Sequence, residues 1–338
     1  MARLLQKALQ GAGAQHDVTL VSQLRSYDGR GEANVQTGVF KAAQGECDRL
    51  RHEGPFDLWV SYHNYYKAPD LLGPVLSKHW SVPYVLFEAT RARKRLTGPW
   101  ARFAKAAEAA NDTADLIFHF TDHDGVALHE QRAGQQQIAP LAPFLDQADV
   151  TPLTSDVAAC RRSLLTVGMM RGPDKRASYA RLAEILRHVK TEDWHLTVIG
   201  DGPLRSEIEA MFAPLRARVT FAGQFSADQL AEAYRATDLF LWPGVNEAYG
   251  MVYLEAQAAG VPALAEDRPG VRNVLPKAAL LALDDPRSFA ARIDLLLTND
   301  GVYESAARDA HRLVQQRHLF PRAQEQIFRH IDPLLKAL

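Results

Sequence analysis

Short apolar runs alternate with segments of helical periodicity along most of the chain. In the first half, runs typical of buried strands cover residues 56–62, 82–87 and 115–120. In the second half they cover residues 163–170, 194–199, 219–223, 238–242, 263–265 and 280–283. Segments that favour helices lie at residues 71–79, 121–131, 177–189, 229–236, 302–317 and 322–337. This alternation predicts an α/β fold with parallel sheets and right-handed crossovers.

The N-terminal segment departs from the order expected of such a fold. Residues 2–10 favour a helix that ends at Gly11, and residues 17–21 favour a strand. In a doubly wound domain the first strand lies in the middle of the sheet, so a first half that opens with a helix is expected to lack its first strand. Gly11 and Gly13 do not make a dinucleotide fingerprint, because they follow a helix and no third glycine completes the pattern. This argues against a dehydrogenase.

The apolar run at residues 238–242 leads into the most informative stretch of the chain. Pro243 ends the run, Glu247 lies in the loop that follows, and helical periodicity begins at Gly250. Glu255 then lies one to two turns into the helix. Two carboxylates therefore flank the start of one helix.

The start of this helix suits a phosphate. Gly250, Met251 and Val252 carry its first N–H groups, which lack partners within the helix and lie at the positive end of its dipole. Gly250 has no side chain, so an anion can approach the backbone closely. The two carboxylates can accept hydrogen bonds from the hydroxyls of a sugar, and the amides can bind a phosphate. Together they indicate a site for a sugar nucleotide.

Residues 247–256, Glu-Ala-Tyr-Gly-Met-Val-Tyr-Leu-Glu-Ala, resemble the signature of the retaining glycosyltransferases of family 4, also called glycosyl transferases group 1. The resemblance implies the GT-B architecture, with two Rossmann-like doubly wound domains facing a cleft. Residues 1–150 are then expected to form the acceptor-side domain, and residues 151–318 the nucleotide-sugar domain. Residues 319–338 are expected to form a helix that packs back on the first domain.

The resemblance also implies roles for residues of the second half. Arg171 and Lys175 match the cations that hold the donor diphosphate, Glu255 the ligand of the ribose hydroxyls, and Glu247 the residue that orients the sugar. The donor site is expected to include Gly168, Gly202 and Tyr249 as well. Two cations stabilise the leaving diphosphate as charge develops, so neither a metal nor a tightly bound cofactor is expected.

The acceptor is expected on the first half. His63 follows the predicted strand at residues 56–62, and Glu88 follows the one at 82–87, where the family often has a histidine. For His63, a loop residue bonded to nearby backbone is an equally good interpretation. A basic segment follows, with Trp100 after it, and it fits an anionic acceptor, a membrane surface or a solvated turn. Its cations are Arg91, Arg93, Lys94 and Arg95.

A metal site at residues 119–129 is disfavoured. His119, His123 and His129 lie near acidic residues, but Thr121 or Asp122 is a natural helix N-cap there. The segment is better explained as a strand that runs into a helix.

Composition narrows the class of protein. The 338 residues carry a net charge of −1, which disfavours nucleic acid as a partner, and the two cysteines show no ligand spacing. No long apolar run or secretory segment is present, so a cytoplasmic location is expected, with peripheral membrane contact as one interpretation of the basic segment. We therefore predict a retaining, metal-independent glycosyltransferase that uses a nucleoside-diphosphate sugar and a glycan, lipid-linked or small-molecule acceptor. A non-catalytic nucleotide-sugar-binding protein and a sugar-nucleotide epimerase of the same fold remain as alternatives.

Overall fold

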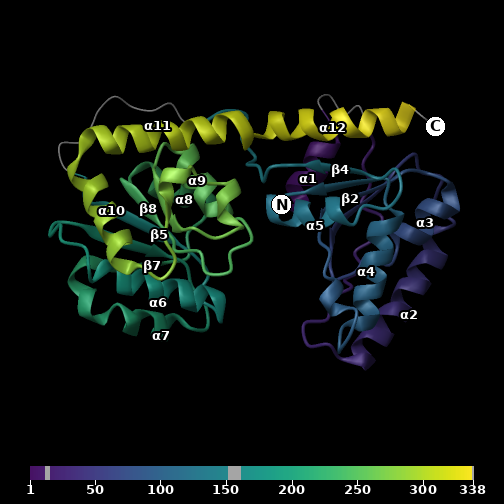
Figure 1. The fold of residues 1–338 in the computed structure, drawn as a ribbon, viewed down its shortest axis with the longest axis horizontal. Helices are drawn as coiled ribbons and strands as arrows, with labels where there is room; N and C mark the ends of the chain where they lie inside the picture. Colours follow the sequence, from purple (N-terminus) through teal and green to yellow (C-terminus); the bar gives the residue numbers. More distant parts are fainter. Residues whose placement is uncertain (12–15, 151–160, 337–338) are drawn as a thin grey trace. The chain divides into compact units, whose positions relative to one another are not determined.

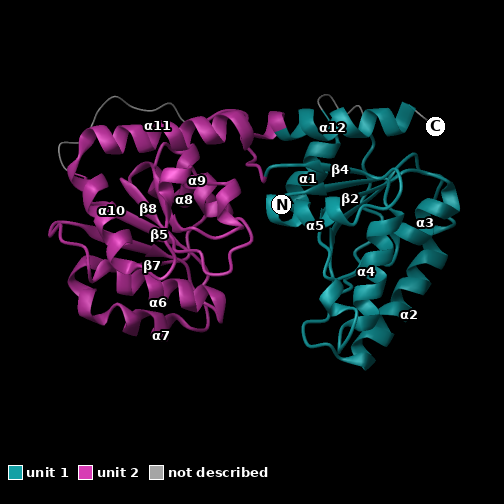
Figure 2. Cartoon of the chain, viewed as in Figure 1, with its two compact units in different colours: residues 1–142, 323–338 teal, residues 143–322 magenta. Residues whose placement is uncertain are grey.

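The computed structural model describes residues 1–11, 16–150 and 161–336. It divides the chain into two compact units (Figure 2). Unit 1 comprises Met1–Ala142 and Ala323–Leu338, and unit 2 comprises Pro143–Arg322. The C-terminal helix α12 (Phe320–Lys336) therefore contributes most of its length to unit 1.

Unit 1 contains a four-stranded parallel sheet of order β1-β2-β3-β4. Its strands are β1 (Trp59–Asn64), β2 (Tyr84–Ala89), β3 (Leu116–His119) and β4 (Gln137–Pro140). Besides α12, its helices are α1 (Ala2–Leu9), α2 (Ala33–Leu50), α3 (Gly73–Trp80), the 3-10 helix η1 (Arg93–Arg95), α4 (Ala101–Thr113) and α5 (Asp122–Glu130). The Phe87 and Phe118 rings stack 4.6 Å apart on the central strands β2 and β3. These apolar strands form the core of the unit.

Two features of unit 1 differ from the sequence-based expectation. Residues 17–21 do not form a strand, and Leu20 is 63% exposed. The segment is held instead by the Val21 carbonyl, which accepts from Arg49 at 2.8 Å, and apolar character alone makes no strand without a hydrogen-bonded neighbour. Helix α2 was not predicted, because its buried positions are Gln36, Ala43, Cys47 and Leu50, a weak apolar stripe.

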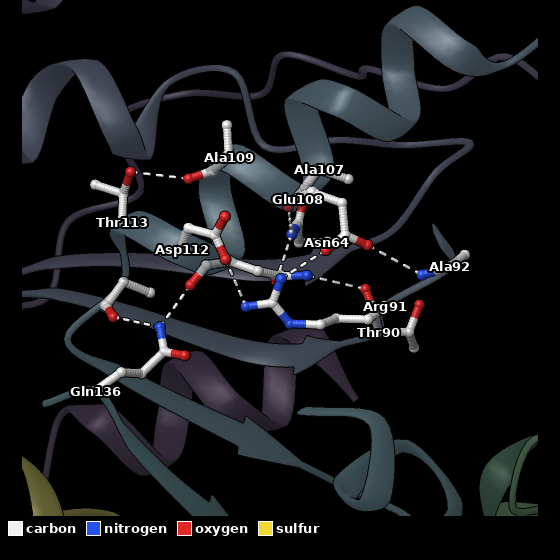
Figure 3. A network of polar contacts seen from close by, with 12 residues as sticks. Asn64, Thr90, Arg91, Ala92, Ala107, Glu108, Ala109, Asp112, Thr113 and Gln136 are labelled. Atoms are coloured by element: carbon white, nitrogen blue, oxygen red, sulfur yellow. Dashed lines mark hydrogen bonds and ion pairs between the residues drawn. The ribbon is translucent and has the colours of Figure 1, made fainter. Parts of the chain in front are cut away.

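A buried polar network ties the ends of the unit 1 strands to α4 (Figure 3). Asn64, the last residue of β1, donates to the Ala107 carbonyl at 2.9 Å and to the Asn111 side chain at 2.8 Å. Asn111 donates in turn to the Thr90 carbonyl at 3.0 Å, and Gln136 donates to the Asn111 carbonyl at 2.5 Å. Since buried amides lose free energy when unpaired, this network fixes the segment that follows β2.

Unit 2 contains a six-stranded parallel sheet of order β10-β9-β8-β5-β6-β7. Its strands are β5 (Ser163–Val167), β6 (His195–Ile199), β7 (Val219–Gly223), β8 (Leu239–Leu241), β9 (Ala263–Glu266) and β10 (Leu280–Leu281). The order runs outward from β5 in one direction and then from β8 in the other. This is the doubly wound arrangement that the alternating pattern predicted.

Helices cover both faces of the unit 2 sheet (Figure 1). They are α6 (Asp174–Leu186), α7 (Arg205–Met211), α8 (Ala227–Arg235), α9 (Met251–Ala258), α10 (Pro286–Thr298) and α11 (Asp300–Arg317), with 3-10 turns η2 (Ala213–Arg218), η3 (Val271–Asn273) and η4 (Lys277–Ala279). Helix α6 packs against α7 and α10, whereas α9 packs against α8 and α11. The strands and helices predicted for this half are confirmed, with ends that shift by a few residues.

Candidate functional site

The candidate donor site lies at the centre of the unit 2 sheet. Strands β5 and β8 are neighbours there, and the chain leaves them in opposite directions. Loops after such a pair diverge and leave a crevice at the carboxyl ends of the strands, where doubly wound folds bind ligands. The predicted residues Gly168, Lys175 and Glu247 all lie in or just after these two loops.

Glycines let two of the loops cross closely. Gly200 has φ +141°, and a Cβ added to it would lie 1.9 Å from the Gly168 carbonyl oxygen. At Gly202, with φ +155°, a Cβ would lie 2.4 Å from the Met170 carbonyl oxygen. Two hydrogen bonds hold the loops together, from Gly168 N–H to the Ile199 carbonyl at 3.0 Å and from Met170 N–H to the Asp201 carbonyl at 2.9 Å. Gly168 and Gly202 thus lie in the two loops that cross, where Gly168 is approached by Gly200 and Gly202 approaches Met170.

Lys175 and Glu247 form an ion pair between the segments that follow β5 and β8. Lys175 lies in the first turn of α6, and its side chain is 23% exposed, against 16% for that of Glu247. Trp242 Nε1 donates to Glu247 Oε2 at 3.1 Å, and Lys175 Nζ lies 5.3 Å from the centre of the Trp242 ring. The buried Trp242 therefore positions both charges. The sequence showed it only as the end of an apolar run.

The loop that carries Glu247 is fixed on both sides. The Ser178 hydroxyl accepts from Val245 N–H at 2.9 Å, and Asn246 donates to Asp174 at 2.8 Å, so the loop is tied to α6. On the other side, a Cβ on Gly270 would lie 2.3 Å from the Glu247 carbonyl oxygen. The position of Glu247 is therefore set before any ligand binds.

Helix α9 starts beside this loop at Gly250, which has φ +75°. This left-handed backbone is available to glycine without strain and turns the chain sharply into the helix. Met251 and Val252 follow as its first residues, and Tyr249 is half-buried just before them. The predicted phosphate-binding amides thus lie at a helix start.

Glu255 lies on α9 and faces α8. Tyr234 Oη donates to Glu255 Oε2 at 3.0 Å. Burial raises the pKa of the Glu255 carboxyl, an effect that this hydrogen bond opposes. Tyr234 is a partner that sequence reasoning missed, because it comes from the preceding helix and no spacing rule connects the two residues.

Arg171 does not join the Lys175–Glu247 pair. It follows the buried Met170 and is exposed. In the described part of the chain its guanidinium forms no ion pair, so it is a cation at the rim of the crevice.

In unit 1 the structure brings His63 and Glu88 together. His63 Nδ1 lies 3.6 Å from Glu88 Oε2. Neither follows its strand as predicted, since the pairing of Asn64 with Ala89 extends the ladder past both residues. Both have left-handed backbone, with φ 69° at His63 and 56° at Glu88. Such strain costs of order 1–3 kcal/mol per residue and tends to occur at functional sites.

The basic segment after β2 is not one surface patch. The Arg91 side chain is 1% exposed and pairs with Glu108 at 2.5 Å and with Asp112 at 2.7 Å (Figure 3). Arg91 is therefore a structural cation, contrary to the expectation that it contacts a partner, because two acidic residues of α4 lie within its reach. Arg93 and Lys94 are exposed, whereas Arg95 and Trp100 are half-buried.

His119, the last residue of β3, has a structural partner. His119 Nδ1 lies 2.9 Å from the Thr121 carbonyl oxygen, and the Thr121 hydroxyl accepts from Asp124 N–H at 3.2 Å as the N-cap of α5. The N-cap prediction is confirmed. Over residues 1–11, 16–150 and 161–336, no group of three potential metal ligands gathers. Within the same residues no helix combines the length and apolar character needed to cross a membrane.

The sequence is similar to a family of known proteins. Residues 161–299 match the family model described as glycosyl transferases group 1. A D-inositol 3-phosphate glycosyltransferase of Salinispora tropica is 26% identical over an alignment of 312 residues, and the match covers 82% of this chain and 64% of the relative. The sulfoquinovosyl transferase SQD2 of Arabidopsis thaliana is 32% identical over 104 residues, 30% of this chain and 20% of that protein. The chain thus spans between a fifth and about two thirds of these relatives.

Solved structures share the fold. Sucrose-phosphate synthase from Thermosynechococcus elongatus aligns with a TM-score of 0.69 at 18% identity, covering 90% of this chain and 80% of the other. Anabaena Alr3699/HepE in complex with UDP and glucose aligns with a TM-score of 0.67 at 17% identity, covering 90% and 84%. At this identity the likeness establishes the architecture.

Proposed function

We propose that this chain, a group 1 glycosyltransferase of the GT-B fold, transfers a sugar with retention from a nucleoside-diphosphate sugar to an acceptor hydroxyl. The observation that carries the proposal is the Lys175–Glu247 pair at the switch point of the unit 2 sheet, beside the start of α9. It supplies a cation for the diphosphate and a carboxylate for the sugar within one crevice.

The donor is assigned residue by residue. Glu255 takes the ribose hydroxyls, while the amides of Gly250, Met251 and Val252 take phosphate oxygens. Lys175 stabilises the leaving diphosphate as negative charge develops on it, and Arg171 at the rim adds a second cation. One such contact contributes on the order of 3 kcal/mol to the transition state, which makes a metal unnecessary.

The donor sugar and the acceptor are assigned to different residues of the chain. Glu247 orients the sugar, since Trp242 and the flanking loops already hold its carboxylate in place. His63 and Glu88 contribute to the acceptor site on unit 1, where their strained backbone supports a functional role. Arg93 and Lys94 give a surface for peripheral contact with the cytoplasmic face of an anionic membrane.

Donor binding tests the proposal first. A thermal-unfolding screen with UDP-, GDP- and ADP-sugars is expected to find one nucleotide that stabilises the protein, by about 2.7 kcal/mol at 100 times its dissociation constant. Lys175→Gln is expected to weaken this binding strongly, because it removes the cation beside the diphosphate. Arg176→Gln is the matched control, since this exposed residue of α6 pairs with Glu207 outside the crevice. Full donor affinity in Lys175→Gln contradicts the assignment.

Product analysis separates transfer from the alternatives. With a labelled donor, a glycosylated acceptor with the donor's anomeric configuration supports retaining transfer. An epimerised sugar nucleotide identifies an epimerase, and unchanged donor with every acceptor identifies a binding protein. EDTA is expected to leave the reaction rate unchanged.

A further inference from the structure

Two cations of unit 1 lie over one pair of aromatic rings. Tyr66 and Trp100 meet edge to face, with ring centroids 5.7 Å apart. Lys67 Nζ lies 5.7 Å from the Tyr66 centroid and 5.4 Å from that of Trp100. Arg95 Cζ lies 5.0 Å and 5.5 Å from the same two centroids. We call these four residues the cation–aromatic cluster.

The backbone holds the cluster in place from two sides. Tyr65 and Ala68 close a tight turn with two backbone hydrogen bonds, at 3.3 and 2.9 Å, so that Tyr66 and Lys67 lie at its tip. Asp28 N–H donates to the Lys67 carbonyl at 2.8 Å, and Trp100 Nε1 donates to the Asp28 carbonyl at 3.0 Å. One segment thus fixes both the turn and the indole ring.

The buried network fixes the third element, the turn that carries Arg95 (Figure 3). Glu108 pairs with Arg91 and also accepts from Ala92 N–H at 3.1 Å. The Ala92 carbonyl accepts from Arg95 N–H at 2.7 Å and so starts η1. Arg91 is therefore the anchor of the basic segment, and Arg95 is the residue that it presents to the rings.

The two cations carry uncompensated charge. Among the described residues no carboxylate forms an ion pair with Lys67 or Arg95, and the Arg95 Nε atom is buried without a hydrogen-bond partner. Each cation lies 5.0 to 5.7 Å from both ring centroids and has no carboxylate among the described residues to offset its charge, so an anion that contacts both cations gains two favourable charge interactions. A planar guanidinium and an ammonium over the same two rings suit the dianionic phosphate monoester better than a singly charged carboxylate.

The cluster continues into the residues assigned to the acceptor. The rings of His63 and Tyr65 lie 4.6 Å apart, and those of Tyr65 and Tyr66 lie 5.7 Å apart. A row of rings therefore leads from the His63–Glu88 pair to the cations. We propose that the cation–aromatic cluster binds a phosphate group of the acceptor, whose polyol part lies along these rings. This inference rests on the proposed function, because it specifies the acceptor.

Binding of soluble phosphates by the full chain tests the inference. By isothermal titration, glucose 6-phosphate is expected to bind at least about tenfold more tightly than glucose, and inorganic phosphate to compete with it. Arg95→Gln and Lys67→Gln are each expected to lose about tenfold in affinity for glucose 6-phosphate. Arg93→Gln is the matched control, because it removes the same charge from an exposed position of the same turn.

The possible results distinguish a failure of this inference from a failure of the proposed function. Equal affinity in the wild type, Arg95→Gln and Lys67→Gln overturns the inference, as does an equal loss in Arg93→Gln. Thermal unfolding of each variant shows whether it is folded, and the Lys67→Gln result stands even if Arg95→Gln does not fold. Nucleotide binding is measured in parallel. If the donor binds, but neither soluble phosphates nor phosphatidic acid vesicles bind through Arg95 and Lys67, only this inference fails. Phosphate binding without any donor binding removes the proposed function.

A phosphate of a lipid headgroup has the same chemistry, and vesicles distinguish this source. Sedimentation with vesicles of phosphatidylcholine containing phosphatidic acid is compared with neutral vesicles. Vesicle binding that Arg95→Gln abolishes, without binding of soluble phosphates, supports the site and assigns the phosphate to a lipid. Vesicle binding that depends on Arg93 and Lys94 alone, again without soluble phosphate binding, overturns it.

Discussion

At the residue scale, Glu255 combines a cost to stability with a role in binding. Burial raises the pKa of its carboxyl above the ordinary value of 4.5. The folded protein therefore binds this proton more tightly than the unfolded chain does. The free energy of unfolding falls as the pH rises from 4.5 through the raised pKa, and the cost is complete above it.

We expect Glu255→Gln to act in opposite directions on stability and binding. At pH 7 the ligand-free variant is expected to melt at a higher temperature than the wild type, because a desolvated charge is removed. The difference is expected to shrink as the pH falls and to vanish well below pH 4.5, where the carboxyl is protonated in both the folded and the unfolded wild type. Donor-nucleotide affinity is expected to fall by about tenfold, because the charged acceptor for the ribose hydroxyls is lost. Thermal unfolding with and without nucleotide at both pH values measures all three effects.

A second variant, Tyr234→Phe, tests whether the ionised Glu255 carboxylate is what lowers the stability at pH 7. Tyr234→Phe removes the hydrogen bond that favours the ionised carboxyl, so the pKa of Glu255 is expected to rise further. This variant should therefore melt at a lower temperature than the wild type at pH 7. A lower melting temperature for Glu255→Gln at pH 7 would instead show that the charge stabilises the fold.

The sequence supplied the carboxylates of the donor site but not their partners. Glu247 and Glu255 were predicted from a spacing within one loop and helix. Trp242 directly follows strand β8 and Tyr234 lies on helix α8, and only the folded chain brings them within hydrogen-bond distance of Glu247 and Glu255. Contacts between elements carry no short-range signal in the sequence, which is why these two side chains were missed.

At the scale of elements, the crossing of two loops depends on glycine. We expect Gly200→Ala to destabilise unit 2 by about 1–3 kcal/mol, because the positive φ is strained for alanine and the new Cβ meets the Gly168 carbonyl oxygen. Since that crossing shapes the donor crevice, nucleotide affinity is expected to fall as well. Urea unfolding and nucleotide titration measure the two effects.

A glycine elsewhere gives the control. Gly45 lies on α2 with nothing within 4 Å of an added Cβ, so Gly45→Ala is expected to stabilise the helix by about 0.5–1 kcal/mol and to leave nucleotide binding unchanged. If Gly200→Ala proves as stable as the wild type, the loops move apart more easily than this packing implies.

Strands were predicted best where they are buried on both faces. The run at residues 239–241 is wholly apolar and the one at residues 163–167 is mostly apolar, as expected of parallel strands between two helical layers. Strand ends were less certain, because His63 and Glu88 are polar and belong to the ladder only through backbone pairing. Helix α2 was missed for a related reason, since small and polar side chains cover its buried stripe.

At the scale of the whole molecule, the chain passes from one unit to the other at two places, after Ala142 and after Arg322. Within unit 2 the segments next to these places are joined. Leu145 N–H donates to the His318 carbonyl at 2.8 Å, and Phe320 N–H donates to the Gln147 carbonyl at 3.0 Å. The buried His318 ring donates from Nδ1 to the Pro143 carbonyl at 2.6 Å. A single histidine thus anchors both connections.

The protonation of His318 is expected to set the acid stability of this junction. Burial lowers the pKa of its imidazole from 6.5 to about 4. Between these values the unfolded chain takes up a proton that the folded protein does not, so the free energy of unfolding falls as the pH falls. The loss approaches about 3 kcal/mol below pH 4, at 1.36 kcal/mol per unit of pKa.

We expect His318→Gln to remove this part of the pH dependence. Its free energy of unfolding should change less between pH 6.5 and pH 4 than that of the wild type, because no buried imidazole remains to be protonated. Urea unfolding across this range gives the slope, and the exposed His52→Gln should keep the wild-type slope. The same slope in all three proteins would mean that other groups govern acid unfolding. A flatter slope in His318→Gln alone would assign this part of the acid sensitivity to the buried imidazole of unit 2.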